Sequence, residues 1–385
     1  MPEHKTIRYL HAIISMAAIG SVYGWSGSAS LLLTSEAWTP AETLRFFMVL
    51  VAGIGAGVAL ATAPQKSIGS SSTAALGLAL WGATLLFLPL AGLYRGLSWT
   101  ALVLALLGGI GVGVAYLTLL SLFRDLMANR TTLLSGIIGP LGFGSGSLIA
   151  CAALLVRADQ QGLTRIQQGF GLLSLLCAVS LPFIFPGSRP SLSRTHAAPA
   201  GPARGIQYLW ILLFLNVAPG MALVAITIPW FISHGVSQQP AILLMCAALP
   251  ALPLGQLAGA AVAKRWGENQ AFRVMFVLRA MVFAIAATGL GPSGSWIVLA
   301  ITLACHGGGF GLIPRIVGNT LLREHPASLA YVLSSWGAGG IVGIALFYPG
   351  IGRAHEAFGF VGLILLMLIG IALSFRYRKE LIAIR

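Results

Sequence analysis

The sequence predicts an all-helical membrane protein whose twelve transmembrane helices form two pseudo-symmetric halves of six. Three observations predict this fold class. Hydrophobic residues make up 57% of the 385 residues and charged residues only 8%, whereas charged residues are about 25% of a soluble domain. Apolar runs of the length that a helix needs to cross a bilayer recur along the whole chain. The two halves of the sequence also match each other at a constant offset. The runs alternate too weakly between apolar and polar residues for an outer-membrane barrel.

The apolar runs place the predicted helices in order. The spans are 9–33, 45–64, 73–93, 99–123, 131–156, 166–186, 206–232, 240–263, 271–291, 295–320, 327–350 and 357–376. The first run is too long for the core of a signal peptide. Thr39, Pro40 and Glu42 predict a capped start for the second span. Residues 187–205 have linker composition and separate an N-terminal bundle, 1–186, from a C-terminal bundle, 206–385.

The distribution of Lys and Arg predicts the orientation. With the N-terminus inside, the inner segments hold sixteen Lys and Arg residues and the outer loops hold five. Cytoplasmic loops are the ones enriched in these residues, so we expect both termini in the cytoplasm, with a bacterial inner membrane as the location. This bias accounts for the net charge of +14, and no nucleic-acid partner is expected. We expect a monomer whose partners are membrane lipid and a small-molecule substrate.

No pattern for catalysis or metal binding is visible. The four cysteines are far apart and each lies in or beside an apolar run, which favours small buried side chains over a disulfide or a metal site. We find no ATP site and no catalytic triad. The sequence therefore predicts a protein that is not an enzyme and that needs no cofactor.

An internal repeat supports the two-half organisation. At an offset of 198 residues, glycines and a lysine coincide: Gly57 with Gly255, Lys66 with Lys264, Gly69 with Gly267, Gly109, Gly111 and Gly113 with Gly307, Gly309 and Gly311, and Gly139 and Gly142 with Gly337 and Gly340. Six spans in each half make the repeat parallel. We expect the glycines inside spans to let neighbouring helices approach closely.

On these features the chain resembles the major facilitator superfamily of transporters along its whole length. The loop signature of that superfamily is G-x-L-A-D-R-x-G-R-R. Arg265 and Gly267 occupy its basic and glycine positions after span eight, and Lys264 replaces the acid. After span two Gly69 matches, and Lys66 again replaces the acid. The resemblance implies gating loops at these positions, without the charge lock that the acid usually makes.

A narrower resemblance is to the oxalate/formate antiporter group. It rests on the glycine-rich segment 307–314 and on 109–136, which contains Arg124 and Asp125, also expected in a gating loop. The basic residue of that group in span eleven is missing, because the segment reads Ser334-Ser335-Trp336-Gly337. A dicarboxylate specificity therefore does not carry over.

Ionisable residues inside spans are the first candidates for a site, because they are costly there. All nine acids lie in loops, tails or span ends, which disfavours a proton-coupled cation exporter. Arg315 in span ten is expected either to bind an anion or to extend to the inner surface. Arg279 in span nine is interpreted as structural. His306 lies nine residues before Arg315, half a turn out of phase, and either carries a proton or forms a structural hydrogen bond.

Polar and aromatic residues in spans one and seven are further candidates. Ser15, Ser26 and Ser30 fall within about 60° of one another on a straight helix, with Tyr23 and Trp25 beside them. Asn216 precedes Pro219-Gly220, which is typical of a bent helix with a polar group at the bend. Tyr116, Asn319 and Trp336 complete the predicted substrate-binding set. Each residue either lines a cavity or packs between helices.

These observations predict a secondary transporter, an antiporter or a symporter, that moves a small carboxylate-like organic anion by alternating access. Export or uptake of a drug, siderophore or similar metabolite is the alternative within transport. A receptor or assembly factor on the same scaffold is the alternative from another class.

Overall fold

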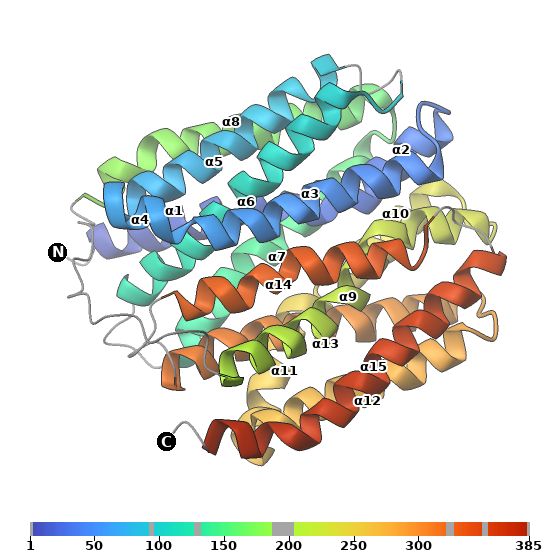
Figure 1. Ribbon diagram of the computed structural model, residues 1–385. Helices are drawn as coiled ribbons and strands as arrows, with labels where there is room; N and C mark the ends of the chain where they lie inside the picture. Colours follow the sequence, from blue (N-terminus) through green and yellow to red (C-terminus); the bar gives the residue numbers. More distant parts are fainter. Residues whose placement is uncertain are drawn as a thin grey trace. The chain divides into compact units, whose positions relative to one another are not determined.

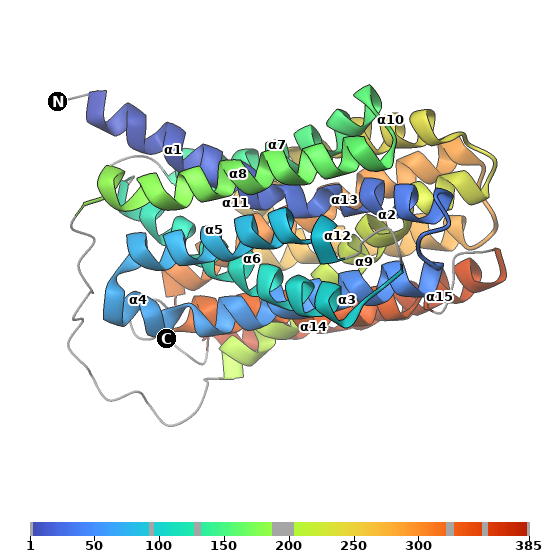
Figure 2. The same ribbon diagram turned by 90° about the horizontal axis from the view of Figure 1, so that it is seen from above.

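A computed structural model describes residues 3–91, 96–126, 132–186, 204–320, 327–348 and 353–382. The linker predicted at 187–205 lies almost wholly outside the described residues. The chain divides into two compact units, Met1–Thr195 and His196–Arg385. The described residues form α-helices and short 3-10 helices (Figures 1 and 2).

The N-terminal unit contains the first six predicted spans. Its elements are α1 (Glu3–Gly20), η1 (Ser21–Gly24), α2 (Trp25–Thr34), α3 (Pro40–Leu60), α4 (Thr62–Ile68), α5 (Ser70–Phe87), η2 (Pro89–Ala91), α6 (Trp99–Leu126), α7 (Thr132–Val156) and α8 (Gln160–Ile184). Helix α3 packs against α6, α5 packs against α6 and α8, and α1 packs against α7. The capping box predicted before the second span is present, with the Thr39 backbone N–H donating to Glu42 Oε2 over 2.7 Å.

The C-terminal unit contains the last six spans and repeats the same helix pairings. Its elements are α9 (Arg204–Ser233), α10 (Gln238–Ala248), α11 (Ala251–Trp266), α12 (Glu268–Ala286), α13 (Pro292–Thr320), α14 (Ser328–Ala345) and α15 (Arg353–Ile382). Helix α11 packs against α13, α12 against α13 and α15, and α9 against α14. Ten of the described helical stretches are long and apolar enough to cross a bilayer. The all-helical membrane fold predicted from the sequence is confirmed.

The repeat is visible in backbone geometry at the predicted gating loops. Gly69 and Gly267 precede α5 and α12 and have φ angles of 84° and 90°. Residues with side chains avoid this region, so glycine suits both turns. The two turns share a conformation at the offset of 198 residues found in the sequence.

At its centre, span eight is displaced by about one helical turn from the position that the offset of 198 residues predicts. Gly109 and Gly307 each lie against a backbone carbonyl oxygen, that of Leu50 in one unit and that of Leu252 in the other. Those two leucines are 202 positions apart, not 198. The predicted pairing of Gly57 with Gly255 is therefore wrong, because the two glycines do not occupy equivalent positions in the two units.

The displacement of span eight is also seen at a second glycine contact, and it coincides with a break in the helix. Gly57 lies against Ile110, and Gly259 lies against Gly308, which is the repeat partner of Ile110. Span two runs as one helix to Leu60, whereas span eight is broken by a turn between Ala248 and Ala251. Pro250 lies in this turn and has no N–H with which to continue the helix.

Span one is also discontinuous. The 3-10 segment η1 separates α1 from α2. A 3-10 helix turns about 120° per residue and an α-helix about 100°, so four residues rotate α2 by about 80° relative to a straight helix. Ser15 therefore does not share one continuous stripe with Ser26 and Ser30, and the straight-helix prediction is corrected.

Candidate functional site

A buried hydrogen-bond network joins three helices of the C-terminal unit. Arg279 of α12 is 0% exposed. Its guanidinium Nη1 donates to the backbone oxygen of Asn216 on α9 over 2.7 Å, and Nη2 donates to Asn216 Oδ1 over 2.6 Å. Asn216 Nδ2 in turn donates to the backbone oxygen of His306 on α13 over 3.1 Å. Asn216 is therefore the centre of a link between α9, α12 and α13.

The network contains a positive charge whose hydrogen-bond acceptors are all neutral. Besides Asn216, Arg279 donates through Nε to the backbone oxygen of Met275 over 3.4 Å. The Phe276 ring lies 5.5 Å from the guanidinium carbon. No carboxylate pairs with Arg279 among the side chains that the structure describes. A buried charge without a counter-ion is costly and depends strongly on its few partners.

Aromatic residues extend this network toward α14. The His306 ring lies 5.0 Å from the Phe310 ring, and Phe310 meets Trp336 edge-on at 4.9 Å. His306 and Trp336 are 1% exposed. Gly220 lies against the His306 ring, where a side chain would collide with it. Three predicted site residues, Asn216, His306 and Trp336, thus belong to one cluster of the C-terminal unit.

A second aromatic cluster lies in the N-terminal unit. Phe143 of α7 receives Tyr23 edge-on at 5.1 Å and Tyr116 edge-on at 5.7 Å. The structure therefore brings Tyr23 and Tyr116 together through a residue that the sequence analysis missed. The sequence offers little signal for Phe143, because a phenylalanine among glycines inside a span resembles ordinary packing.

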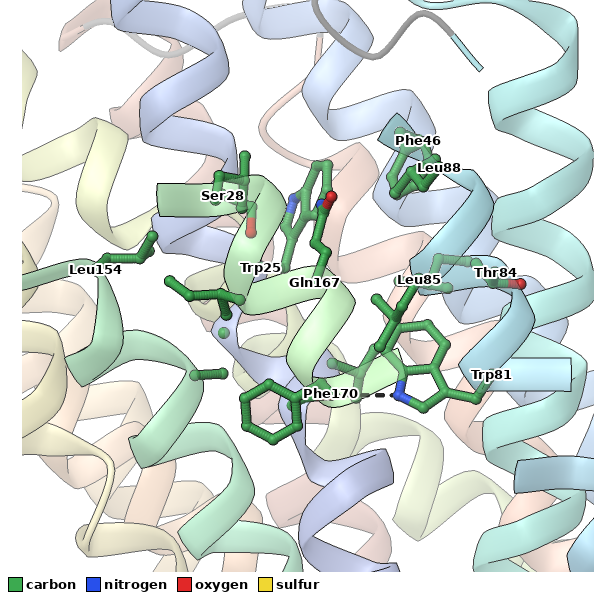
Figure 3. A pocket seen from close by; sticks show the side chains of 17 residues that line it. Trp25, Ser28, Phe46, Trp81, Thr84, Leu85, Leu88, Leu154, Gln167 and Phe170 are labelled. Atoms are coloured by element: carbon green, nitrogen blue, oxygen red, sulfur yellow. Dashed lines mark hydrogen bonds between the residues drawn. The ribbon is translucent and has the colours of Figure 1, made fainter. Parts of the chain in front are cut away.

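The other predicted residues of span one separate from this cluster. Trp25 stacks on Phe46 with ring centres 4.7 Å apart and lines a cavity instead (Figure 3). The Ser15 hydroxyl hydrogen-bonds His11 Nδ1 over 3.3 Å, and Ser26 is buried. Trp25 separates from Tyr23 because residues two positions apart point about 200° apart around a helix, and the break at η1 further rotates α2 relative to α1.

The candidate anion-binding arginine and the basic residues of the predicted gating loops are exposed where their side chains are described. Arg315 is exposed on α13, whereas His306 is buried on the same helix, in agreement with their half-turn phase difference. Lys66, Lys264 and Arg265 are exposed at the ends of α4 and α11. The side chains of Asn319, Arg124 and Asp125 lie outside the described residues.

Solved transporter structures share this fold. The nucleoside transporter NupG matches with a TM-score of 0.72 and 13% identity over 98% of this chain and 99% of its own. The xylose transporter XylE from E. coli matches with a TM-score of 0.71 and 14% identity over 95% of this chain and 98% of its own. A bacterial homologue of the human lysosomal transporter Spinster matches with a TM-score of 0.70 and 14% identity over 99% of this chain and 98% of its own.

Sequence comparisons do not identify a narrower family for the chain. No family model and no curated protein sequence matches the chain. The chain has the fold of major facilitator transporters, and the comparisons give no support to the narrower resemblance to the oxalate/formate antiporter group.

Proposed function

We propose that the protein is a secondary transporter that moves a small organic anion across the membrane by alternating access between its two six-helix units. The transporter part of the proposal is supported by the likeness to solved transporters, which extends over nearly the full length of the chain. A fold alone hosts many functions, so the substrate class must be argued from the residues of the site.

The observation that carries the anion class is the state of Arg315. Its side chain is exposed in the middle of the C-terminal half of α13, and it has no hydrogen-bond or ion-pair partner among the described residues. An anion that leaves water needs a fixed positive charge, because an unpaired charge costs several kcal/mol. A guanidinium also fits a carboxylate with two parallel hydrogen bonds. Arg279 cannot serve in the state described, since it is fully buried and bonded to Asn216.

A neutral metabolite is the second candidate, and a specific observation favours it. The cluster of Tyr23, Phe143 and Tyr116 offers aromatic faces without charge. Two of the similar structures are a nucleoside transporter and a xylose transporter. Aromatic surfaces with a few polar groups suit neutral ring compounds.

Binding measurements on Arg315 variants separate the two candidates. A panel of labelled carboxylates and neutral sugars and nucleosides is first tested on the purified protein in lipid nanodiscs. If a carboxylate binds, Arg315→Lys should weaken its binding partly, because the charge remains but the two-pronged geometry is lost. Arg315→Gln should nearly abolish it.

The control is Arg165→Gln, the same chemical change at an exposed position on α8, which should leave affinity unchanged. Unchanged carboxylate affinity in a well-folded Arg315→Gln protein would contradict the anion proposal. Binding of neutral compounds alone would favour the second candidate.

The remaining features of the mechanism are proposals of the same kind. We propose that Gly69 and Gly267, at the starts of α5 and α12, lie in cytoplasmic gating loops together with the basic residues beside them, and that both termini are cytoplasmic. Because the described acids lie in loops or at span ends, any proton that is coupled to transport would be carried by His306, by the substrate or by a loop acid at a cavity mouth.

A further inference from the structure

The N-terminal unit contains a cavity that is separate from the clusters described above. It is enclosed by η1, α2, α3, α5, α7 and α8, and it measures about 600 Å³ with its open mouth included. Trp25, Phe46, Trp81 and Phe170 supply aromatic walls (Figure 3). The closed part of the cavity has room for only a few groups of the size of a water molecule, so a ligand there must be small.

Two polar atoms of the lining have no hydrogen-bond partner although they are buried. They are the indole Nε1 of Trp25, which is a donor, and the amide oxygen Oε1 of Gln167, which is an acceptor. Trp25 is 6% exposed and Gln167 is 7% exposed. A buried donor or acceptor without a partner costs about 1–3 kcal/mol, so the folded protein leaves an unused donor and an unused acceptor in the same cavity.

Three other polar groups of the lining, those of Trp81, Ser21 and Thr84, have hydrogen-bond partners within the chain. Trp81 Nε1 donates to the backbone oxygen of Ala18 over 3.1 Å, and the Ser21 hydroxyl donates to the same oxygen over 2.7 Å. The Thr84 hydroxyl donates to the backbone oxygen of Leu104 over 3.2 Å. Trp25 Nε1 and Gln167 Oε1 differ from these groups, because a ligand would have to supply their hydrogen-bond partners.

The lining also defines the chemistry of a ligand. None of the seventeen residues that line the cavity is charged, which disfavours an ion because its charge would stay unpaired. A hydroxyl group accepts one hydrogen bond and donates another, so a single hydroxyl offers what Trp25 and Gln167 each lack. Aromatic and aliphatic walls suit a ring beside it.

We propose that this cavity binds a neutral, ring-sized apolar molecule that bears one hydroxyl group, which accepts a hydrogen bond from Trp25 Nε1 and donates one to Gln167 Oε1. Such a molecule would connect α2 to α8. The site differs in chemistry from the anion site proposed around Arg315, and the inference does not depend on it.

The test uses photolabelling of the full-length protein in nanodiscs with a trifluoromethyl-diazirine derivative of phenol. Labelled peptides are mapped by mass spectrometry, and unlabelled phenol, toluene and benzoate compete with the probe. The expected result is labelling confined to peptides of α2, α3, α5, α7 and α8. Phenol should compete about three- to tenfold better than toluene, the factor for one or two net hydrogen bonds, and benzoate should compete least.

Two variants test the polar pair directly. Trp25→Phe keeps an aromatic ring without the donor, and Gln167→Leu keeps the size without the acceptor. Each should reduce the advantage of phenol over toluene. Trp230→Phe is the matched control, because its buried indole Nε1 also has no partner but lies in the other unit.

Labelling outside the cavity, or equal competition by phenol and toluene on the unmodified protein, would overturn the proposal. The comparison of phenol with toluene needs no variant, so a variant that fails to fold leaves the test decisive.

Discussion

The hydrogen bonds between Arg279 and Asn216 predict an unequal cost for removing either partner. Asn216→Ala takes one acceptor from a fully buried guanidinium and also removes the donor to the His306 carbonyl. Arg279→Met instead removes the charge and leaves a neutral amide oxygen without its donor. The first change leaves one donor of a charged group without its acceptor, although the backbone acceptors at positions 216 and 275 remain. The second change leaves a neutral acceptor without its donor.

The magnitudes follow from these two consequences. Leaving one donor of a buried charged group without its acceptor costs more than it does for a neutral group. Leaving a neutral acceptor unsatisfied costs about 1–3 kcal/mol. The double variant should cost less than the sum of the two single variants, because removal of both partners leaves neither group stranded.

Reversible unfolding in mixed micelles of dodecyl sulfate and a mild detergent measures the free energies of unfolding. Arg315→Met is the control, because it makes the same change at an exposed position and should shift stability by less than about 0.5 kcal/mol. A cost for Arg279→Met that is larger than for Asn216→Ala, or additive effects in the double variant, would refute the reasoning.

Two further predictions concern packing and proton coupling. Gly146→Ala should lower stability by about 1–3 kcal/mol, because its new methyl group would meet the Ala17 carbonyl oxygen. Gly169→Ala should raise stability by up to about 1 kcal/mol, because nothing lies within 4 Å of that position and alanine is the better helix former; thermal unfolding of the pair checks both signs. His306→Gln should leave transport and its pH profile mostly intact, because the ring packs against Phe310 and Gly220 in the interior. A lost pH dependence with substrate binding retained would instead make His306 the proton carrier.

Local sequence patterns were sufficient for the approximate positions of the spans and for one helix start. Apolar run length predicted the spans, and Thr39 and Glu42 predicted a cap that the structure contains. The repeat also matched Gly69 with Gly267, and in the structure both have a positive φ angle, which favours glycine.

The interior of each unit was less predictable, because it depends on contacts between distant segments. Nothing in the local sequence indicates that η1 turns Tyr23 toward Phe143 and Trp25 toward the cavity. The one-turn shift of span eight also escapes an ungapped repeat, since it appears only when α11 is packed against α13. Gln167 has no sequence signal, because its importance comes from a missing partner.

Counterflow in proteoliposomes tests the central claim most directly. Vesicles are loaded with one unlabelled compound from a panel of organic anions and neutral metabolites, and entry of the same labelled compound is followed after dilution. The proposed function predicts a transient accumulation of label for at least one organic anion, which is absent in vesicles without protein. Accumulation of neutral compounds alone would contradict the anion class, and no exchange of any compound would contradict the transporter itself and favour a receptor on the same scaffold.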